Sequence, residues 1–128
     1  MRRLATVCLV VRDYDEALVF YRDALGFQVL EDRDMGPGRR WVVVSPGEGS
    51  ALLLAKAGND IQAARIGDQT GGRVGFFLET DDFSRDHAAM LARGVRFLEA
   101  PRHEPYGTVA VFEDLYGNRW DLVEPARR

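Results

Sequence analysis

Hydrophobic and polar positions follow one order twice along this chain. The β-branched run TVCLVVRD (6–13) predicts a buried strand, after which the period changes to that of a helix. Asp13 with Glu16 three residues later is typical of a helix start, and Gly26 provides a stop. Between them, apolar side chains recur at helical spacing: Ala17, Phe20, Tyr21, Ala24 and Leu25. Three further strands are predicted, at 27–32, 40–45 and 51–56.

The same order begins again at Arg73. A strand is predicted over 73–82 and a helix over 82–94, with Asp82 and Gly94 in the places that Asp13 and Gly26 hold in the first half. We expect the apolar stripe of this helix to consist of Ala88, Leu91 and Val95. The remaining strands are predicted at 95–100, 108–114 and 119–124.

Two βαβββ modules are therefore the simplest interpretation, and they predict an α+β fold in one domain spanning 1–128. Module one covers about 1–57, a polar, glycine-rich linker covers 58–72, and module two covers 73–128. The helix of each module covers one face of its small sheet and leaves the other face open. We expect the two open faces to form a half-barrel around a cavity, where a ligand would bind.

Composition narrows the function classes. Apolar residues make up 46% and charged residues 29% of the 128, which is typical of a folded soluble domain. The formal net charge of −3 argues against nucleic-acid binding. No apolar run reaches the roughly 20 residues that cross a bilayer, so we expect no membrane partner. Cys8 is the single cysteine, which excludes an internal disulfide and favours a cytoplasmic location.

Two segments resemble a known family. The helix segment VVRDYDEALVFYRDALGF and the strand segment YGNRWDLVEP, within paired βαβββ units, resemble the vicinal oxygen chelate superfamily. This superfamily includes glyoxalase I, extradiol dioxygenases, fosfomycin-resistance enzymes and bleomycin-resistance binding proteins. The resemblance covers essentially the whole chain. It implies the fold and a cavity lined by strands, whereas the activity varies among members.

The resemblance also indicates where a metal would bind. Its metal-dependent members place histidine or glutamate at positions that correspond here to Thr6, Ala51, Gly75 and Asp121. A catalytic metal generally needs about three protein ligands, and only Asp121 is a carboxylate. We therefore expect no metal and no cofactor, with Asp121 as a polar anchor in the cavity or a salt-bridged strand residue.

Aromatic residues suggest what the cavity holds. Trp41, Phe77 and Tyr106 fall on or beside strands that line the cavity in the resembled fold, and such rings stack on flat apolar molecules. We expect Trp120, which is out of phase with Asp121, to pack beneath a helix. The predicted ligand-binding set is Thr6, Cys8, Trp41, Leu53, Phe77, Tyr106 and Asp121.

The leading hypothesis is a metal-independent protein that binds a small apolar or aromatic molecule, of sequestering or resistance type, as a homodimer. The alternative is a glyoxalase- or dioxygenase-like enzyme (a lyase, an isomerase or a ring-cleaving dioxygenase). It would use a displaced metal site around Glu79, His103 and Asp121, or metal-free acid–base chemistry by Glu79 and Asp121. His103 lies in a predicted loop, and His87 is predicted to be a surface residue of the second helix. The sequence names neither the ligand nor the reaction.

Overall fold

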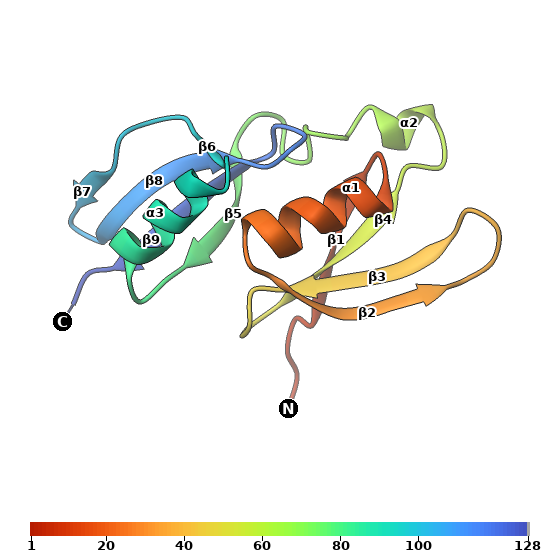
Figure 1. Cartoon of the computed structure of the whole chain (residues 1–128), viewed down its shortest axis with the longest axis horizontal. Helices are drawn as coiled ribbons and strands as arrows, with labels where there is room; N and C mark the ends of the chain where they lie inside the picture. The colour runs from red at the N-terminus through yellow and green to blue at the C-terminus, as the bar shows by residue number, and fades with distance from the viewer. Residues whose placement is uncertain (128) are drawn as a thin grey trace. The chain divides into compact units, whose positions relative to one another are not determined.

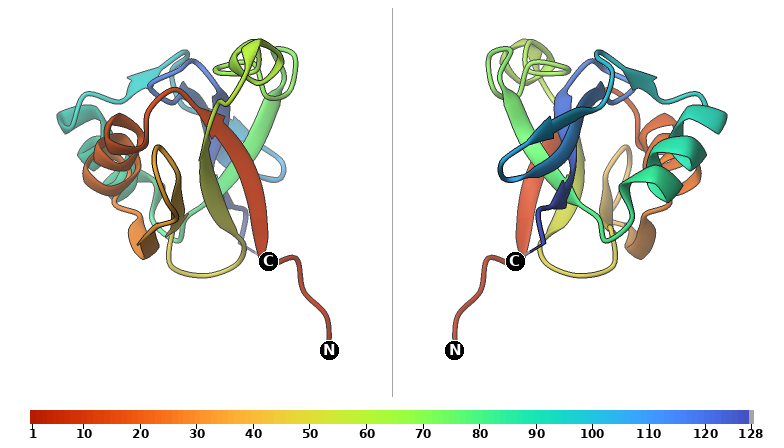
Figure 2. Two further views of the ribbon diagram at one scale, coloured as in Figure 1. Left: turned by 90° about the vertical axis from the view of Figure 1, so that its right-hand side faces the viewer. Right: turned by 90° about the vertical axis from the view of Figure 1, so that its left-hand side faces the viewer.

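A computed structural model describes residues 1–127, which divide into two compact units, Met1–Gln69 and Thr70 onward. In each unit a helical segment lies across one face of that unit's own sheet and leaves the other face open (Figures 1 and 2). The predicted α+β class with two βαβββ modules is confirmed. Among the described residues, no helix is long and apolar enough to cross a membrane.

The first unit contains a four-stranded sheet in the order β1-β4-β3-β2. The last strand lies between the first and third, parallel to β1 and antiparallel to β3. Side chains beneath the helix form the core, because alternate residues of each strand point to that face; they include Leu9, Val11, Val42, Val44, Leu52 and Leu54. The elements are β1 (Thr6–Val11), α1 (Tyr14–Leu18), the π-helix η1 (Val19–Ala24), β2 (Gln28–Asp34), β3 (Arg40–Ser45), β4 (Ala51–Lys56) and α2 (Asp60–Ala63).

The first helix begins and ends where the sequence predicts. The Asp13 carboxylate accepts a hydrogen bond from the backbone of Glu16 at 2.9 Å, and Gly26 adopts a positive φ of 74° just past the end. The widening of the second half into η1 was not predicted: the Leu25 N–H donates to the Phe20 carbonyl five residues back. Hydrophobic spacing does not distinguish this geometry from an α-helix, because Tyr21 is buried in either case.

The second unit repeats this topology with one addition. Its sheet has the order β5-β9-β8-β6. The additional strand β7 also pairs with β8, at the opposite end of that strand from β6. The last strand again lies between the first, to which it is parallel, and the strand before it. The elements are β5 (Val74–Glu79), α3 (Phe83–Ala92), β6 (Arg96–Phe97), β7 (Arg102–Glu104), β8 (Gly107–Glu113) and β9 (Arg119–Pro125).

The strand predicted at 95–100 is wrong in its second half. Regular pairing in β6 ends at Phe97, and the Glu99 carboxylate accepts the Val111 N–H at 3.0 Å where a strand carbonyl would otherwise do so. Pro101 has no N–H to continue a ladder. The residues 102–104, predicted to belong to a loop, form β7 instead.

The predicted stripe on the second helix is also partly wrong. Ala88 is exposed and Leu91 is 50% exposed, whereas Val95 is buried just past the helix end. The buried residues of α3 are Phe83 and Met90. His87 lies between them in the stripe, half-buried, with its ring 5.2 Å from that of Phe83 and 4.5 Å from that of Phe97. A pattern of apolar residues alone omits a histidine that packs between aromatic rings.

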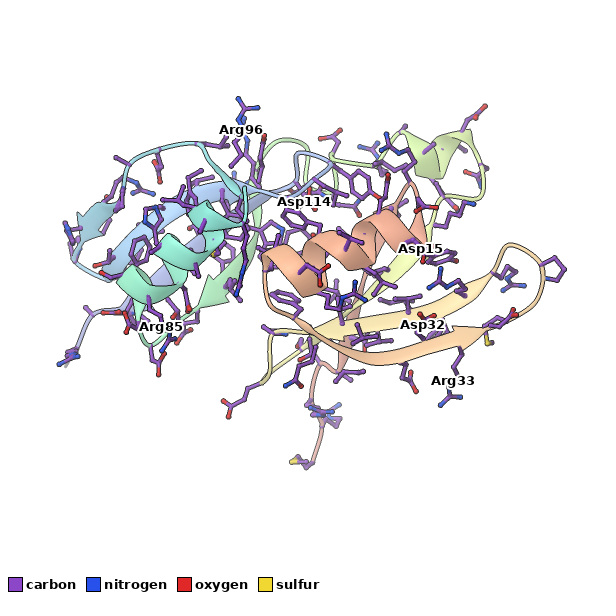
Figure 3. All side chains as sticks on the ribbon, in the orientation of Figure 1. Asp15, Asp32, Arg33, Arg85, Arg96 and Asp114 are labelled. Carbon is purple, nitrogen blue, oxygen red and sulfur yellow. The ribbon has the colours of Figure 1, made fainter. Side chains whose placement is uncertain are left out.

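A buried aspartate fixes the turn between β8 and β9. Asp114 is 4% exposed, and its Oδ1 accepts the N–H groups of Tyr116 and Asn118, each at 2.9 Å. Its Oδ2 accepts the Asn118 side-chain amide at 2.8 Å. Figure 3 labels Asp114 at this turn. The turn sets the register in which β9 pairs with β8.

Gly107 lies at the start of β8 with a φ of 148°, and a Cβ there would overlap the backbone carbonyl of Glu124. We therefore expect Gly107→Ala to lower the free energy of unfolding by about 3 kcal/mol or more, measured by chemical denaturation. Gly38 also has positive φ, at 69°, but faces open space. As the matched control, Gly38→Ala should lose only about 1–2 kcal/mol. Equal losses would contradict this account of Gly107.

Candidate functional site

The open face of the first sheet carries four of the predicted ligand-binding residues. Cys8 pairs with Leu53, which in turn pairs with Val43. Thr6 and Trp41 are each two residues away on their own strands and so share that face. Thr6, Cys8 and Trp41 are exposed and Leu53 is half-buried, so the structure brings these side chains together on one accessible surface.

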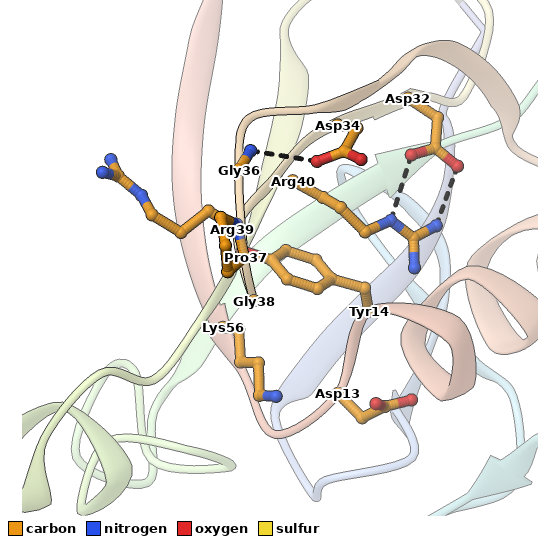
Figure 4. Close-up of a pocket in the computed structure, with 10 residues that line it drawn as sticks. All are labelled: Asp13, Tyr14, Asp32, Asp34, Gly36, Pro37, Gly38, Arg39, Arg40 and Lys56. Carbon is orange, nitrogen blue, oxygen red and sulfur yellow. Dashed lines mark hydrogen bonds and ion pairs between the residues drawn. The ribbon is translucent and has the colours of Figure 1, made fainter.

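Strands β3 and β4 separate at one end of the first unit, and a cavity lies there. The β3–β4 pairing extends only to Val42 and Leu54, after which the strands separate. A cavity of about 500 Å³ there is lined by Trp41, Leu53, Tyr14 and Met35, among others. It adjoins a second cavity of about 810 Å³, drawn in Figure 4, with which it shares Tyr14, Gly38, Arg39, Arg40 and Lys56. Two residues that line the first cavity, Trp41 and Leu53, were predicted as ligand-binding residues. The separation of β3 from β4 was not predicted.

Arg40 connects the start of α1 to the β2–β3 hairpin through two ion pairs. Its guanidinium donates to both carboxylate oxygens of Asp32, at 3.2 and 2.8 Å, and to Asp15 at 2.7 Å. It also lies over the Tyr14 ring, 5.3 Å from the centroid. Figure 3 labels the two carboxylates, and Figure 4 shows the paired bonds to Asp32. These hydrogen bonds raise the pKa of Arg40, so it stays charged and holds the hairpin to the start of α1.

The Trp41 ring is held in place yet partly uncovered. Its indole N–H donates to Glu31 at 2.7 Å, while 42% of the residue stays exposed. Glu31 also pairs at 3.0 Å with Arg33, which lies two residues further along the same strand, β2. A ring oriented in this way loses little conformational freedom when a ligand stacks on it. Glu31 was not among the predicted site residues.

The open face of the second sheet centres on Asp121. Asp121 pairs with Phe77 on one side and Val111 on the other. The next pairs along the same face are Glu79 with Val123 and Val109 with Arg102. Phe77 is 67% exposed, and Tyr106, at the β7–β8 turn, is 56% exposed. Phe77, Glu79 and Asp121 thus share one face, as the strand spacing predicts.

Arg102 is bound by two carboxylates on this face. Its Nε donates to Glu99 at 2.9 Å and its Nη1 to Glu104 at 2.7 Å. Hydrogen bonds to Glu99, to Glu104 and to the Tyr106 side chain raise the pKa of the guanidinium. Sequence reasoning missed all three charged residues: β7, which carries Arg102 and Glu104, was not predicted, and Glu99 was placed in a strand that ends at Phe97.

One oxygen of Asp121 is buried and has no hydrogen-bond partner. Loss of water raises the pKa of this carboxyl; Arg102 opposes the shift and Glu99 adds to it. Among residues 1–127, neither Arg102 nor any other cation forms an ion pair with it, so Asp121 is a polar group on an open face rather than half of a salt bridge.

The histidines do not join this face. His103 pairs with Thr108, one residue out of phase with Arg102, so it points to the opposite side of the sheet from Asp121. It is exposed and its Nδ1 lies 3.2 Å from the Thr108 hydroxyl. The trio Glu79, His103 and Asp121 is therefore not assembled. Trp120 packs as expected: it is 4% exposed and stacks on Phe76 and Phe112.

The residues at the expected metal positions do not fit a divalent ion. Thr6 pairs with Ala51 in the first unit, which offers one hydroxyl. In the second unit Gly75 has no side chain, and a Cβ at that position would overlap the Thr70 side chain. Asp121 alone is a carboxylate. Within residues 1–127, no three histidine, cysteine, aspartate or glutamate side chains form a group that could hold a metal.

Comparison with known proteins adds independent evidence. A family model described as Glyoxalase/Bleomycin resistance protein/Dioxygenase superfamily matches residues 3–122. A protein from Shewanella frigidimarina, described as uncharacterised, is 52% identical over 121 residues, which is 92% of this chain and 90% of that protein.

Solved structures agree with the fold over nearly the full chain. The crystal structure of UcmS2 is 32% identical with a TM-score of 0.82, covering 96% of this chain and 98% of that one. The crystal structure of TnmS3, an antibiotic binding protein from Streptomyces sp. CB03234, is 29% identical with a TM-score of 0.77 and covers 98% of both chains.

The raised pKa of Asp121 makes a prediction about stability. The pKa of the Asp121 carboxyl is higher in the folded chain than its ordinary value of 3.8. The protonated carboxyl therefore favours the folded chain below pH 3.8, and this contribution is lost as the pH rises through the pKa of the folded chain. Asp121→Asn should therefore raise the melting temperature at pH 7, and the gain should shrink towards zero in acid. Melting curves from pH 3 to 8 measure it, and a gain that is unchanged or larger in acid would contradict it.

Proposed function

The chain belongs to the Glyoxalase/Bleomycin resistance protein/Dioxygenase superfamily, and we propose that within it the protein binds a small apolar or aromatic molecule without a metal ion. The observation that carries this proposal is the set of exposed aromatic side chains: Trp41 and Phe77 on sheet faces that the helices leave open, and Tyr106 in the β7–β8 turn. In this proposal the protein sequesters the molecule or confers resistance to it and does not convert it to a product.

Ring stacking supplies the affinity in this proposal. Each aromatic contact contributes about 0.5–1.5 kcal/mol beyond the area that it buries. Trp41 is oriented by Glu31 and stands beside a cavity of about 500 Å³, a volume within the range of small-molecule sites. Cys8 and Leu53 extend this apolar surface on the same face.

The comparisons favour binding over catalysis. TnmS3, which is similar over nearly its whole length, is an antibiotic binding protein. The donor atoms at Thr6, Ala51, Gly75 and Asp121 do not make a chelate. Glu79 and Asp121 share a face, so metal-free acid–base chemistry is the form of the enzyme alternative that the geometry leaves open. The homodimer and the cytoplasmic location stay predictions.

A thermal-shift screen tests the proposal directly. The protein is heated with hydrophobic antibiotics, thiol conjugates and catechols, each with and without Fe, Zn, Mn or Ni and with a chelator. We expect a saturable rise in melting temperature from at least one organic compound that the chelator does not change, because a ligand stabilises the state it binds. A rise that appears only with metal, or conversion of the compound to a product, would contradict the proposal.

Trp41 should carry part of the affinity for a compound that binds the open face of the first unit. Trp41→Ala should weaken its binding about tenfold, measured by calorimetric titration. Leu91→Ala is the matched control, because Leu91 is a 50% exposed apolar residue on the outer side of α3. It should leave the dissociation constant within about twofold.

Cys8 provides a second readout of the same contacts. It is the chain's one cysteine and is exposed on the face of Trp41 and Leu53, so a thiol-reactive dye can reach it. Saturating ligand should slow its modification in proportion to occupancy. Unchanged modification together with full affinity in Trp41→Ala would place the ligand elsewhere than on this face.

A further inference from the structure

The buried Asp121 oxygen is an unexplained feature of the second module. Buried polar atoms in folded proteins nearly always have a partner, and one without a partner suggests a missing ligand, ion or water. The other strand neighbours of this carboxylate are apolar: Phe77 on β5 and Val111 on β8. Neither side chain can donate a hydrogen bond, so the protein itself leaves the oxygen unsatisfied.

The charges around Asp121 are predominantly negative. The carboxylates Glu79, Glu99 and Glu104 lie on the same face or bind to its strands, and Arg102 is the cation among them. Arg102 is already engaged by Glu99 and Glu104, at 2.9 and 2.7 Å.

Two more cations lie on this face: Arg119, two residues before Asp121 on β9, and Arg96 on β6. Arg119 donates to the Gly72 carbonyl at 3.3 Å, and Arg96 pairs with Glu113 at 3.3 Å. With Glu113 and Asp121 included, five of the named residues are carboxylates and three are arginines, so the formal charge of this set is negative. The pKa of Asp121 is raised mainly because burial removes water from the carboxyl; Arg102 opposes this rise and Glu99 adds to it.

Two exposed aromatic rings occur beside this negative region. Phe77 is directly paired with Asp121 and is 67% exposed. Tyr106, which is 56% exposed, contributes to the hydrogen bonding of Arg102. A ring next to an unpaired carboxylate can hold a molecule by stacking on its apolar body while the carboxylate accepts hydrogen bonds from a charged donor.

We propose that Asp121 is a specificity-determining residue that selects ligands with a positively charged amino group attached to an aromatic or apolar body. The ammonium group donates to the half-buried Asp121 carboxylate, and the attached ring lies against the exposed Phe77 ring. The excess of carboxylates disfavours organic anions at the same place. This inference rests on the proposed function and adds to it the chemical class of the ligand.

Three naphthalene compounds that differ in one group test the inference: 2-naphthylmethylamine, 2-naphthylmethanol and 2-naphthoate. Dissociation constants are measured by fluorescence titration at low and at physiological salt. We expect the amine to bind about tenfold more tightly than the alcohol and the carboxylate to bind most weakly. Added salt should narrow the difference between the amine and the carboxylate, because it screens exposed charges.

Asp121→Asn should raise the dissociation constant of the amine about tenfold and leave that of the alcohol within about twofold. Glu48→Gln is the matched control, since it removes one negative charge from an exposed turn of the first unit; it should leave all three constants within about twofold. Equal affinities for the amine and the carboxylate, or an unchanged amine constant in Asp121→Asn, would overturn the inference.

Failure of the inference and failure of the proposed function give different results. If the carboxylate binds as tightly as the amine, or if all three naphthalenes fail while an uncharged or anionic compound from the thermal-shift screen binds, the charge selection is wrong and the proposed function stands. If neither the naphthalenes nor any compound of the screen binds, both are wrong.

Discussion

The position of one strand in each sheet determines most of what this protein presents to a ligand. In both modules the last strand lies between the first strand, to which it is parallel, and the strand before it. Because side chains alternate across a strand, this pairing divides every residue between the helix side and the open side. A shift of one residue would move Trp120 and Leu122 out of the core and Asp121 under the helix, which the apolar core opposes.

The two open faces differ although the modules repeat. The first offers an oriented indole, a thiol and a hollow where two strands part, while the second offers uncovered rings around a carboxylate. Neither carries the set of imidazole and carboxylate groups that a catalytic metal needs. Of the four positions at which the resemblance implies metal ligands, three hold the small residues Thr6, Ala51 and Gly75, and only Asp121 is a carboxylate.

Sequence patterns predicted the strands and caps because these depend on short-range physics. The Asp13 and Asp82 caps and the alternation of β8 and β9 follow from local hydrogen bonding and from burial on one side. The site was only partly predictable. Glu31 acts through Trp41 on the next strand, and the ion pair of Glu99 with Arg102 depends on the bend between β6 and β7, which no hydrophobic period indicates. The π-helical turn at Val19–Ala24 and the short β7 likewise leave no hydrophobic period of their own.

The contact between Thr70 and Gly75 couples these two positions. The Thr70 side chain occupies the space that any side chain at position 75 would need, and its hydroxyl is bound to the Arg73 carbonyl at 2.6 Å. A larger residue at position 75 would therefore displace Thr70 and break this hydrogen bond unless position 70 changed as well. Any attempt to engineer a side chain into the start of β5 would have to redesign the two positions as a pair.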